Sequence, residues 1–127
     1  MRSLRTDALV IVAAALAPAC ASAESVQLLV QSSPLAGFQY YAGGSLWSEM
    51  KAGDRLVLVR EPENPHDPHA VRVEWRGNKL GYLPRAENRS VAAEMDRGAA
   101  IEARIARLVP HRNPWRRLRV DVYLVIP

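Results

Sequence analysis

The longest regular feature of the sequence is an alternation of apolar and polar residues between positions 117 and 126, "RLRVDVYLVI". Successive side chains of a β-strand point to opposite faces, so this period of two predicts a strand with one face turned to a core. The inward residues would be Leu118, Val120, Val122, Leu124 and Ile126. One strand cannot bury such a face alone, so the remaining sequence must supply a sheet and the fold class is mainly β.

Shorter apolar runs predict the other strands, at residues 25–31, 54–61, 70–75, 79–84 and 101–109. The aromatic segment "FQYYAGG", residues 38–44, predicts a further short strand or strand edge, and "RGN" predicts the tight turn of a hairpin. A helix is predicted within residues 85–98, with Asn88 as N-cap and Gly98 as its C-terminal stop. Residues 45–50 favour a brief helical turn.

About six strands with one or two short helices predict a small, closed or nearly closed β-barrel. A curled sheet of this kind would bury the apolar faces and hide the strand edges.

Residues 1–23 have the layout of a cleaved secretory signal: two arginines, an apolar run at 8–17 and a small-residue site ending at Ala23. The apolar run is about half the ~20 residues that a membrane-spanning helix needs, so no membrane span is expected. We therefore expect an exported protein, periplasmic or secreted, whose single domain covers residues 24–127. The sole cysteine, Cys20, leaves a lipoprotein as the alternative, although no leucine precedes it by three positions.

Positive charge is concentrated near the end of the chain. The formal net charge is +4, and residues 104–119 hold six arginines and no acidic residue. The guanidinium group suits bidentate contact with phosphate, but arginine usage also follows from a GC-rich genome. In "RLVPHRNPWRRLR", residues 107–119, Trp115 could hold a nucleic-acid strand by stacking among arginines. The alternative is a solvated hairpin tip with Trp115 folded onto the barrel.

The segment "EPENPHDPH", residues 61–69, is unusually stiff and polar for a connection between two strands. Its three prolines restrict the unfolded loop, and Asn64 and Asp67 can bond nearby backbone and shape turns. A rigid hairpin connection is the simplest interpretation of these residues.

Enzymatic interpretations find little support in the sequence. His66, Asp67 and His69 form an acceptable ligand set for a metal, and a small metal-dependent hydrolase is the weakest alternative. No other cluster completes such a site, and no serine or cysteine lies in a nucleophile motif. We therefore expect no catalytic residues, no metal and no cofactor.

Four segments, taken in order, resemble the HIRAN domain family: "FQYYAG", "LVREPENPHDPHAVRV", "GNKLGYLPR" and the helix ending "MDRG". The combination of "REP-x-NP-x-D-x-x-A-V-x-V" with a following "GYLP" is specific, and the resemblance extends from residue 26 to about residue 126. It implies an OB-like β-barrel with small helical insertions. It also implies binding of single-stranded DNA, with the free 3′ end held in a pocket.

The resemblance also implies roles for single residues. Tyr40 and Tyr41 match the family's paired tyrosines, which would stack on bases. Asp67 matches a loop aspartate that would accept a hydrogen bond from a 3′-hydroxyl and repel a 3′-phosphate. Asn64 would shape the loop or touch the terminal nucleotide, and Arg85 would pair with a phosphate.

The sequence departs from the DNA-binding members at three positions. Gln39 replaces a basic residue, His66 stands where those members have an aromatic ring, and Tyr82 stands where they can have histidine. The candidate nucleic-acid-binding residues are therefore Tyr40, Tyr41, Asn64, His66, Asp67, Tyr82, Arg85 and Trp115.

The first functional hypothesis is a monomeric, non-enzymatic module that binds single-stranded nucleic acid with a free 3′ end. The second keeps the fold and replaces the ligand by a protein or another component of the cell envelope. A dependence of binding on the chemistry of the 3′ end distinguishes the two.

Overall fold

The computed structural model describes residues 25–127, and the predicted signal with its cleavage at Ala23 and the alternative site at Cys20 lies outside the described residues. Across the described range, no helix is long and apolar enough to cross a membrane.

The part of the chain that the structure describes is mainly β, as predicted, with six strands. The strands are β1 (Val26–Pro34), β2 (Arg55–Glu61), β3 (Ala70–Trp75), β4 (Asn78–Tyr82), β5 (Ile101–Leu108) and β6 (Leu118–Ile126). The helices are α1 (Gly43–Leu46), α2 (Arg89–Asp96) and the short 3-10 turns η1 (Phe38–Tyr40), η2 (Trp47–Glu49) and η3 (Pro114–Arg116).

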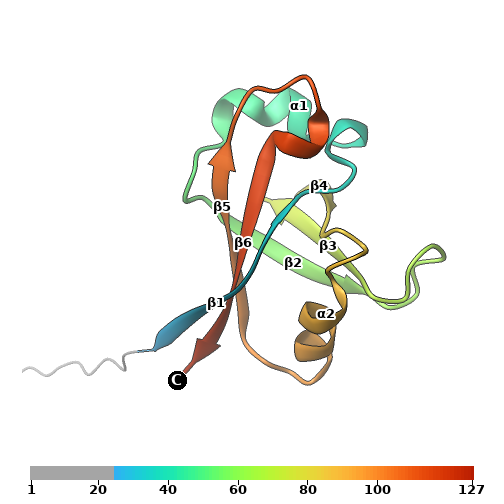
Figure 1. Cartoon of the computed structure of the whole chain (residues 1–127), viewed down its shortest axis with the longest axis vertical. Helices are drawn as coiled ribbons and strands as arrows, with labels where there is room; N and C mark the ends of the chain where they lie inside the picture. Colours follow the sequence, from blue (N-terminus) through green and yellow to red (C-terminus); the bar gives the residue numbers. More distant parts are fainter. Residues whose placement is uncertain (1–24) are drawn as a thin grey trace, which may run out of the picture.

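All six strands form one antiparallel sheet in the order β1-β6-β5-β2-β3-β4. Strands β1, β5 and β6 run along the molecule, β2 and β3 cross them, and α1 lies at one end (Figure 1). The sheet is curled but not closed, so of the two predicted forms, a closed or a nearly closed barrel, the nearly closed one is found. Only an isolated bridge joins its two ends, in which Ala36 N–H donates to the Tyr82 carbonyl at 2.8 Å and Tyr82 N–H donates to the Ala36 carbonyl at 2.9 Å.

The reason for incomplete closure lies directly after β1. Gly37 has φ of +79°, a left-handed conformation that turns the chain into η1 before it can continue along β4. Gly81 on β4 permits the single bridge, because a Cβ atom there would lie 2.3 Å from the Ala36 carbonyl oxygen. The two ends of the sheet therefore meet at one point, which we call the seam: Ala36, Gly81 and Tyr82.

The core is built from the inner faces of the strands. Val71, Val73 and Trp75 of β3 are buried, as their alternation predicts. On β6, Leu118, Val120 and Val122 are buried as well, whereas Leu124 is half-buried and Ile126 is 42% exposed. Pairing with β5 ends at Leu124, after which the Val125 N–H still donates to the Ala100 carbonyl at 2.9 Å, so the last residues of β6 lie at the margin of the core.

The predicted strand at residues 38–44 is wrong, because this segment forms η1 and the start of α1. The aromatic pattern that resembled a strand has another cause, because Phe38 is a buried residue of the hydrophobic core. Gly43 lies so close to the Phe38 ring that a Cβ atom would be 2.3 Å from it. Trp47 contacts the same ring edge-on, with centroids 5.8 Å apart.

Helix α2 lies within the predicted range and buries Val91 and Ala92, while Met95 packs against the core. Asn88 precedes the helix as predicted, but its side chain does not cap it. The buried Asn88 amide instead donates to Asp67 Oδ2 at 2.7 Å. The helix is thereby tied to the β2–β3 loop.

Candidate functional site

A cavity of about 250 Å³, here called the end pocket, lies beside the seam. Its walls come from three separate parts of the chain: the turn after β1, the β2–β3 loop, and the end of β4 with the residues that follow. The lining residues are Ala36, Tyr41, Asn64, His66, Asp67, Ala70, Tyr82, Leu83 and Arg85. Six of the eight candidate residues named from the sequence are among them.

The β2–β3 loop is held in shape by its own side chains. Asn64 Oδ1 accepts from the His66 N–H at 2.8 Å, and Asn64 Nδ2 donates to Glu61 Oε1 at 2.9 Å. Half of the hydrogen-bonding capacity of the Asn64 side chain is therefore used inside the loop. Asn64 shapes the pocket wall, which is one of the two roles expected for it.

Arg60 fixes the far end of the same loop. Its guanidinium donates to the carbonyl oxygens of Pro68 at 3.1 Å and Ala70 at 2.9 Å, and it pairs with Asp96 of α2 at 2.9 Å. The Arg60 side chain is only 13% exposed, so it has a structural role and joins the loop to helix α2. Sequence reasoning assigned it no role, although it stands at the first position of the quoted family motif.

Asp67 is the acidic group of the end pocket. Oδ1 accepts from the His69 N–H at 2.9 Å, Oδ2 accepts from Asn88 at 2.7 Å, and the side chain is 14% exposed. Burial pushes the pKa of Asp67 up, but these two hydrogen bonds and the charges of Arg85 and His69 push it down further, so the pKa lies below its ordinary value. Asp67 is therefore a carboxylate at neutral pH, with lone pairs left to accept from a ligand.

The opposite side of the pocket is aromatic. The rings of Tyr41 and Tyr82 meet edge to face with centroids 6.2 Å apart, and the Tyr82 hydroxyl donates to Glu61 Oε1 at 2.9 Å. Lys79 Nζ lies 4.2 Å from the Tyr41 ring centroid and 4.7 Å from that of Tyr82. Burial lowers the pKa of Lys79, but its contacts with the two tyrosines outweigh this and raise the pKa overall.

Sequence reasoning missed Lys79 for a structural reason. Lys79 and Tyr82 are three positions apart, which in a regular strand places them on opposite faces. In the pairing of β3 with β4, Val73 faces Gly81 and Glu74 faces Lys79, so Leu80 is an extra residue. This bulge brings Lys79 to the same side as Tyr82.

Two candidate residues do not line the end pocket. Tyr40 is 75% exposed on η1, so the tyrosine pair is divided between the pocket and the surface. Trp115 is 45% exposed on η3 and lines a separate cavity. A short 3-10 helix turns the chain by about 120° per residue, which sends neighbouring side chains in different directions.

The weak metal alternative at His66, Asp67 and His69 gains no support. The Asp67 Oδ1 and Oδ2 atoms already accept hydrogen bonds from the His69 N–H and the Asn88 amide. Within residues 25–127, no group of three or more His, Cys, Asp or Glu side chains is arranged to hold a metal.

Residues 28–127 match the family model described as the HIRAN domain. This chain belongs to the HIRAN domain family. The family is known for nucleic-acid binding, and the match covers every residue of the end pocket.

Solved structures agree with this HIRAN fold. A protein from Lactobacillus plantarum superposes with a TM-score of 0.70 at 21% identity, covering 82% of this chain and 100% of the other. The HIRAN domain of human HLTF superposes with a TM-score of 0.59 at 23% identity, covering 80% of this chain and 78% of that one. At these identities the likeness concerns the fold.

A curated relative is the Fanconi-associated nuclease 1 homolog of Oryza sativa subsp. japonica, 38% identical over 53 residues. The matched region is 39% of this HIRAN chain but only 6% of the rice protein.

Proposed function

We propose that this HIRAN chain is a binding module for single-stranded nucleic acid and that the end pocket receives the 3′-terminal nucleotide. The observation that carries the proposal is the convergence of Tyr41, Asp67 and Arg85 from separate segments on one small cavity. A volume of about 250 Å³ is slightly below the ~300–1,000 Å³ usual for ligand pockets, so the pocket suits a small group such as one terminal sugar and base.

The chemistry of the pocket favours a hydroxyl end. The Asp67 carboxylate already accepts from His69 and Asn88, and its remaining lone pairs can accept from a 3′-hydroxyl. A terminal phosphate would bring like charge against this carboxylate and would lose the hydroxyl donor.

The other groups of the pocket suit the rest of a nucleotide. The rings of Tyr41 and Tyr82 offer faces or edges for stacking, which is insensitive to base identity. Lys79 beside them and the exposed Arg85 supply positive charge for the phosphate that precedes the terminal sugar. Binding should therefore depend on the end of the strand and little on its sequence.

The proposal is tested by fluorescence anisotropy with short oligonucleotides that differ only at the 3′ end. We expect tighter binding to a 3′-hydroxyl than to a 3′-phosphate, and we expect Asp67→Asn to remove most of this difference. Glu63→Gln is the matched control, because Glu63 is an exposed acid in the same loop and its replacement changes the charge equally.

Equal affinity of the unmodified protein for both ends would refute the pocket assignment. We further propose that the module has no catalytic activity. An oligonucleotide incubated with the protein and Mg²⁺ should be recovered at full length, and shortened products would contradict this part of the proposal.

A further inference from the structure

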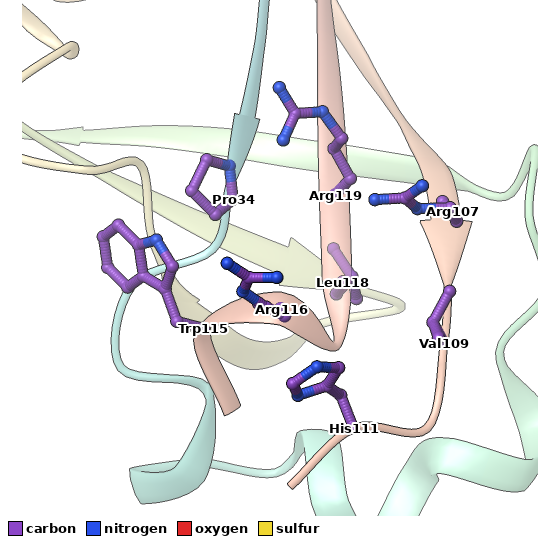
Figure 2. A pocket seen from close by; sticks show the side chains of 8 residues that line it. All are labelled: Pro34, Arg107, Val109, His111, Trp115, Arg116, Leu118 and Arg119. Atoms are coloured by element: carbon purple, nitrogen blue, oxygen red, sulfur yellow. The ribbon is translucent and has the colours of Figure 1, made fainter. Parts of the chain in front are cut away.

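A second cavity of about 450 Å³ lies at the tip of the β5–β6 hairpin, and we call it the arginine groove (Figure 2). Its lining is both apolar and basic. The apolar residues are Pro34, Val109 and Leu118, and the arginines are Arg107, Arg116 and Arg119. In Figure 2, Arg107 extends from β5 toward β6, and Arg116 extends toward Pro34.

The strand register places two of these arginines against each other. Arg107 of β5 pairs directly with Arg119 of β6, after a bulge that separates them from the pair formed by Ile105 and Val120. Like charges directly opposite each other destabilise a sheet. Among residues 25–127, no salt bridge includes Arg107, Arg116 or Arg119. The positive charge of the groove is therefore not neutralised by any carboxylate of residues 25–127.

The surrounding loop is ordered by its own hydrogen bonds. Asn113 Oδ1 accepts from the Trp115 N–H at 3.0 Å and fixes the start of η3. Arg117 Nε donates to the His111 carbonyl oxygen at 2.7 Å. His111 Nδ1 accepts from the Asn113 N–H at 3.0 Å, so the neutral ring carries its proton on Nε2 and can donate from there. These contacts orient the imidazole ring of His111 and fix the backbone that carries the Trp115 indole.

The groove and the end pocket share a border. Pro34 lines the groove, Ala36 lines the end pocket, and the buried Leu35 lies between them. Alternate residues of an extended segment face the same side, and two residues span at most about 7 Å. In addition, η1 packs against η3, which places the helical turn that carries the exposed Tyr40 beside the turn that carries Trp115.

We infer that the arginine groove is a second subsite for the same strand and that it binds the phosphates preceding the 3′-terminal nucleotide. The inference rests on the proposed function for the direction of the strand. From the end pocket, the strand crosses the border at Pro34 and Ala36, and Tyr40 and Trp115 are the rings available for its bases. Arg107, Arg116 and Arg119 then neutralise the sugar-phosphate backbone.

The first test is the dependence of affinity on strand length. Oligothymidylates of about 3 to 18 nucleotides with a 3′-hydroxyl cover the ~4–16 nucleotides that an OB fold occupies. We expect affinity to rise with length until the groove is filled and then to level off. Affinity that is already maximal for the shortest strand would overturn the inference.

The second test removes charge from the groove. Arg107→Gln with Arg116→Gln spares Arg119, which also bonds Ser32 Oγ and the Ser32 carbonyl at 3.0 Å each. For the long strand, the slope of log K against log salt should fall by about 0.7 per lost phosphate contact, or about 1.4 in total. The shortest strand should keep its affinity within about twofold, because it does not reach the groove.

The matched control is Arg55→Gln with Arg97→Gln, which removes the same charge at two exposed arginines paired with Glu102 and Glu94. A salt slope that falls equally in both double variants would overturn the inference, because it would reflect net charge alone. Thermal melts of both variants verify that each is folded.

The two proposals fail in different ways. A groove variant that keeps the preference for a 3′-hydroxyl but loses the gain with length supports both proposals. If the unmodified protein shows no preference at the 3′ end and the groove variant still lowers the salt slope, the end pocket fails and the groove stands as a subsite independent of the end. Unchanged length dependence in the groove variant overturns the groove alone.

Discussion

Gly81 is the residue at which the two ends of the sheet come closest. Its Cα faces the Ala36 carbonyl oxygen, and a Cβ atom would also lie 3.1 Å from the Leu35 side chain. Neither obstacle can move easily, because one is backbone and the other belongs to a buried residue. The requirement for glycine here is therefore set by the seam.

We expect Gly81→Ala to destabilise the domain by about 1–3 kcal/mol, as overpacking typically does. The same change at Gly44 in α1 is the control, because no atom lies within 4 Å of a Cβ placed there. Gly44→Ala should be neutral or slightly stabilising, since alanine favours helix. Urea unfolding of both variants measures the difference, and equal free energies of unfolding would contradict this role of Gly81.

At the scale of single residues, the sequence predicted the groups that line the pocket better than the groups that support them. Asp67, Tyr82 and Arg85 were named from their motif and lie together in the end pocket. Lys79 and Asn88 do not line the pocket but contact residues that do, and they were not identified as such because these contacts depend on a strand bulge and on the docking of α2. Neither arrangement has a local signature in the sequence.

Arg60 is the link between the β2–β3 loop, strand β2 and helix α2. We expect Arg60→Gln to loosen the end of the loop that follows Pro68, because the Pro68 and Ala70 carbonyls lose their common donor. Amide exchange should accelerate at His69 and Ala70, whose N–H groups bond Asp67. At His66 the exchange rate should change less, because Asn64 holds that amide independently.

The control for this loop prediction is Arg55→Gln, at the other end of the same strand, whose contact with Glu102 is 3.9 Å long and exposed. If the His69 amide exchanged as slowly in Arg60→Gln as in the control, Arg60 would not be needed to hold the end of the loop.

At the scale of elements, regular patterns were predictable and short irregular ones were not. Strand β3, the turn after it and helix α2 follow from alternation, turn residues and an apolar stripe. Residues 38–44 were predicted as a strand because the segment is rich in aromatic residues and ends in glycines, as strands often do. Here these residues are needed for another reason, since Phe38 is buried and packs directly against Gly43. What decides between the two is the left-handed Gly37, which stands at the N-cap of η1 directly after the Ala36 bridge.

For the whole molecule, acid sensitivity follows from three carboxylates that fasten loops to the sheet. Hydrogen bonds and neighbouring positive charge outweigh burial and lower the pKa values of Glu61 and Asp67. For Asp54, the Lys51 N–H is the main cause, with the Trp75 indole adding to it, and the pKa is again lowered.

Because these folded-state pKa values lie below the unfolded ones, the stabilisation is complete above the unfolded pKa and is lost as pH falls through the folded pKa. We expect the Tm to be level down to about pH 5 and to fall below about pH 4. Glu61→Gln should lower the Tm at neutral pH and make the acid decline shallower. Calorimetry between pH 7 and about pH 2.5 measures both curves, and parallel curves would exclude Glu61 as a contributor.

The mainly β architecture and approximate strand number could be predicted because alternation is read directly from residues such as Val120 and Val122. The degree of closure could not, because it depends on where β1 stops and on how closely Ala36 can approach Gly81.

The position of the end pocket gives the seam a further meaning. Ala36 and Tyr82 line the end pocket and also form the seam. A molecule bound in the pocket would therefore contact both ends of the sheet at once. The pocket is complete only when the two ends of the sheet are in contact. A ligand that binds only this state shifts the equilibrium toward it by mass action. If the proposed binding holds, a bound strand end should therefore stiffen the domain at the one point where its sheet is least closed.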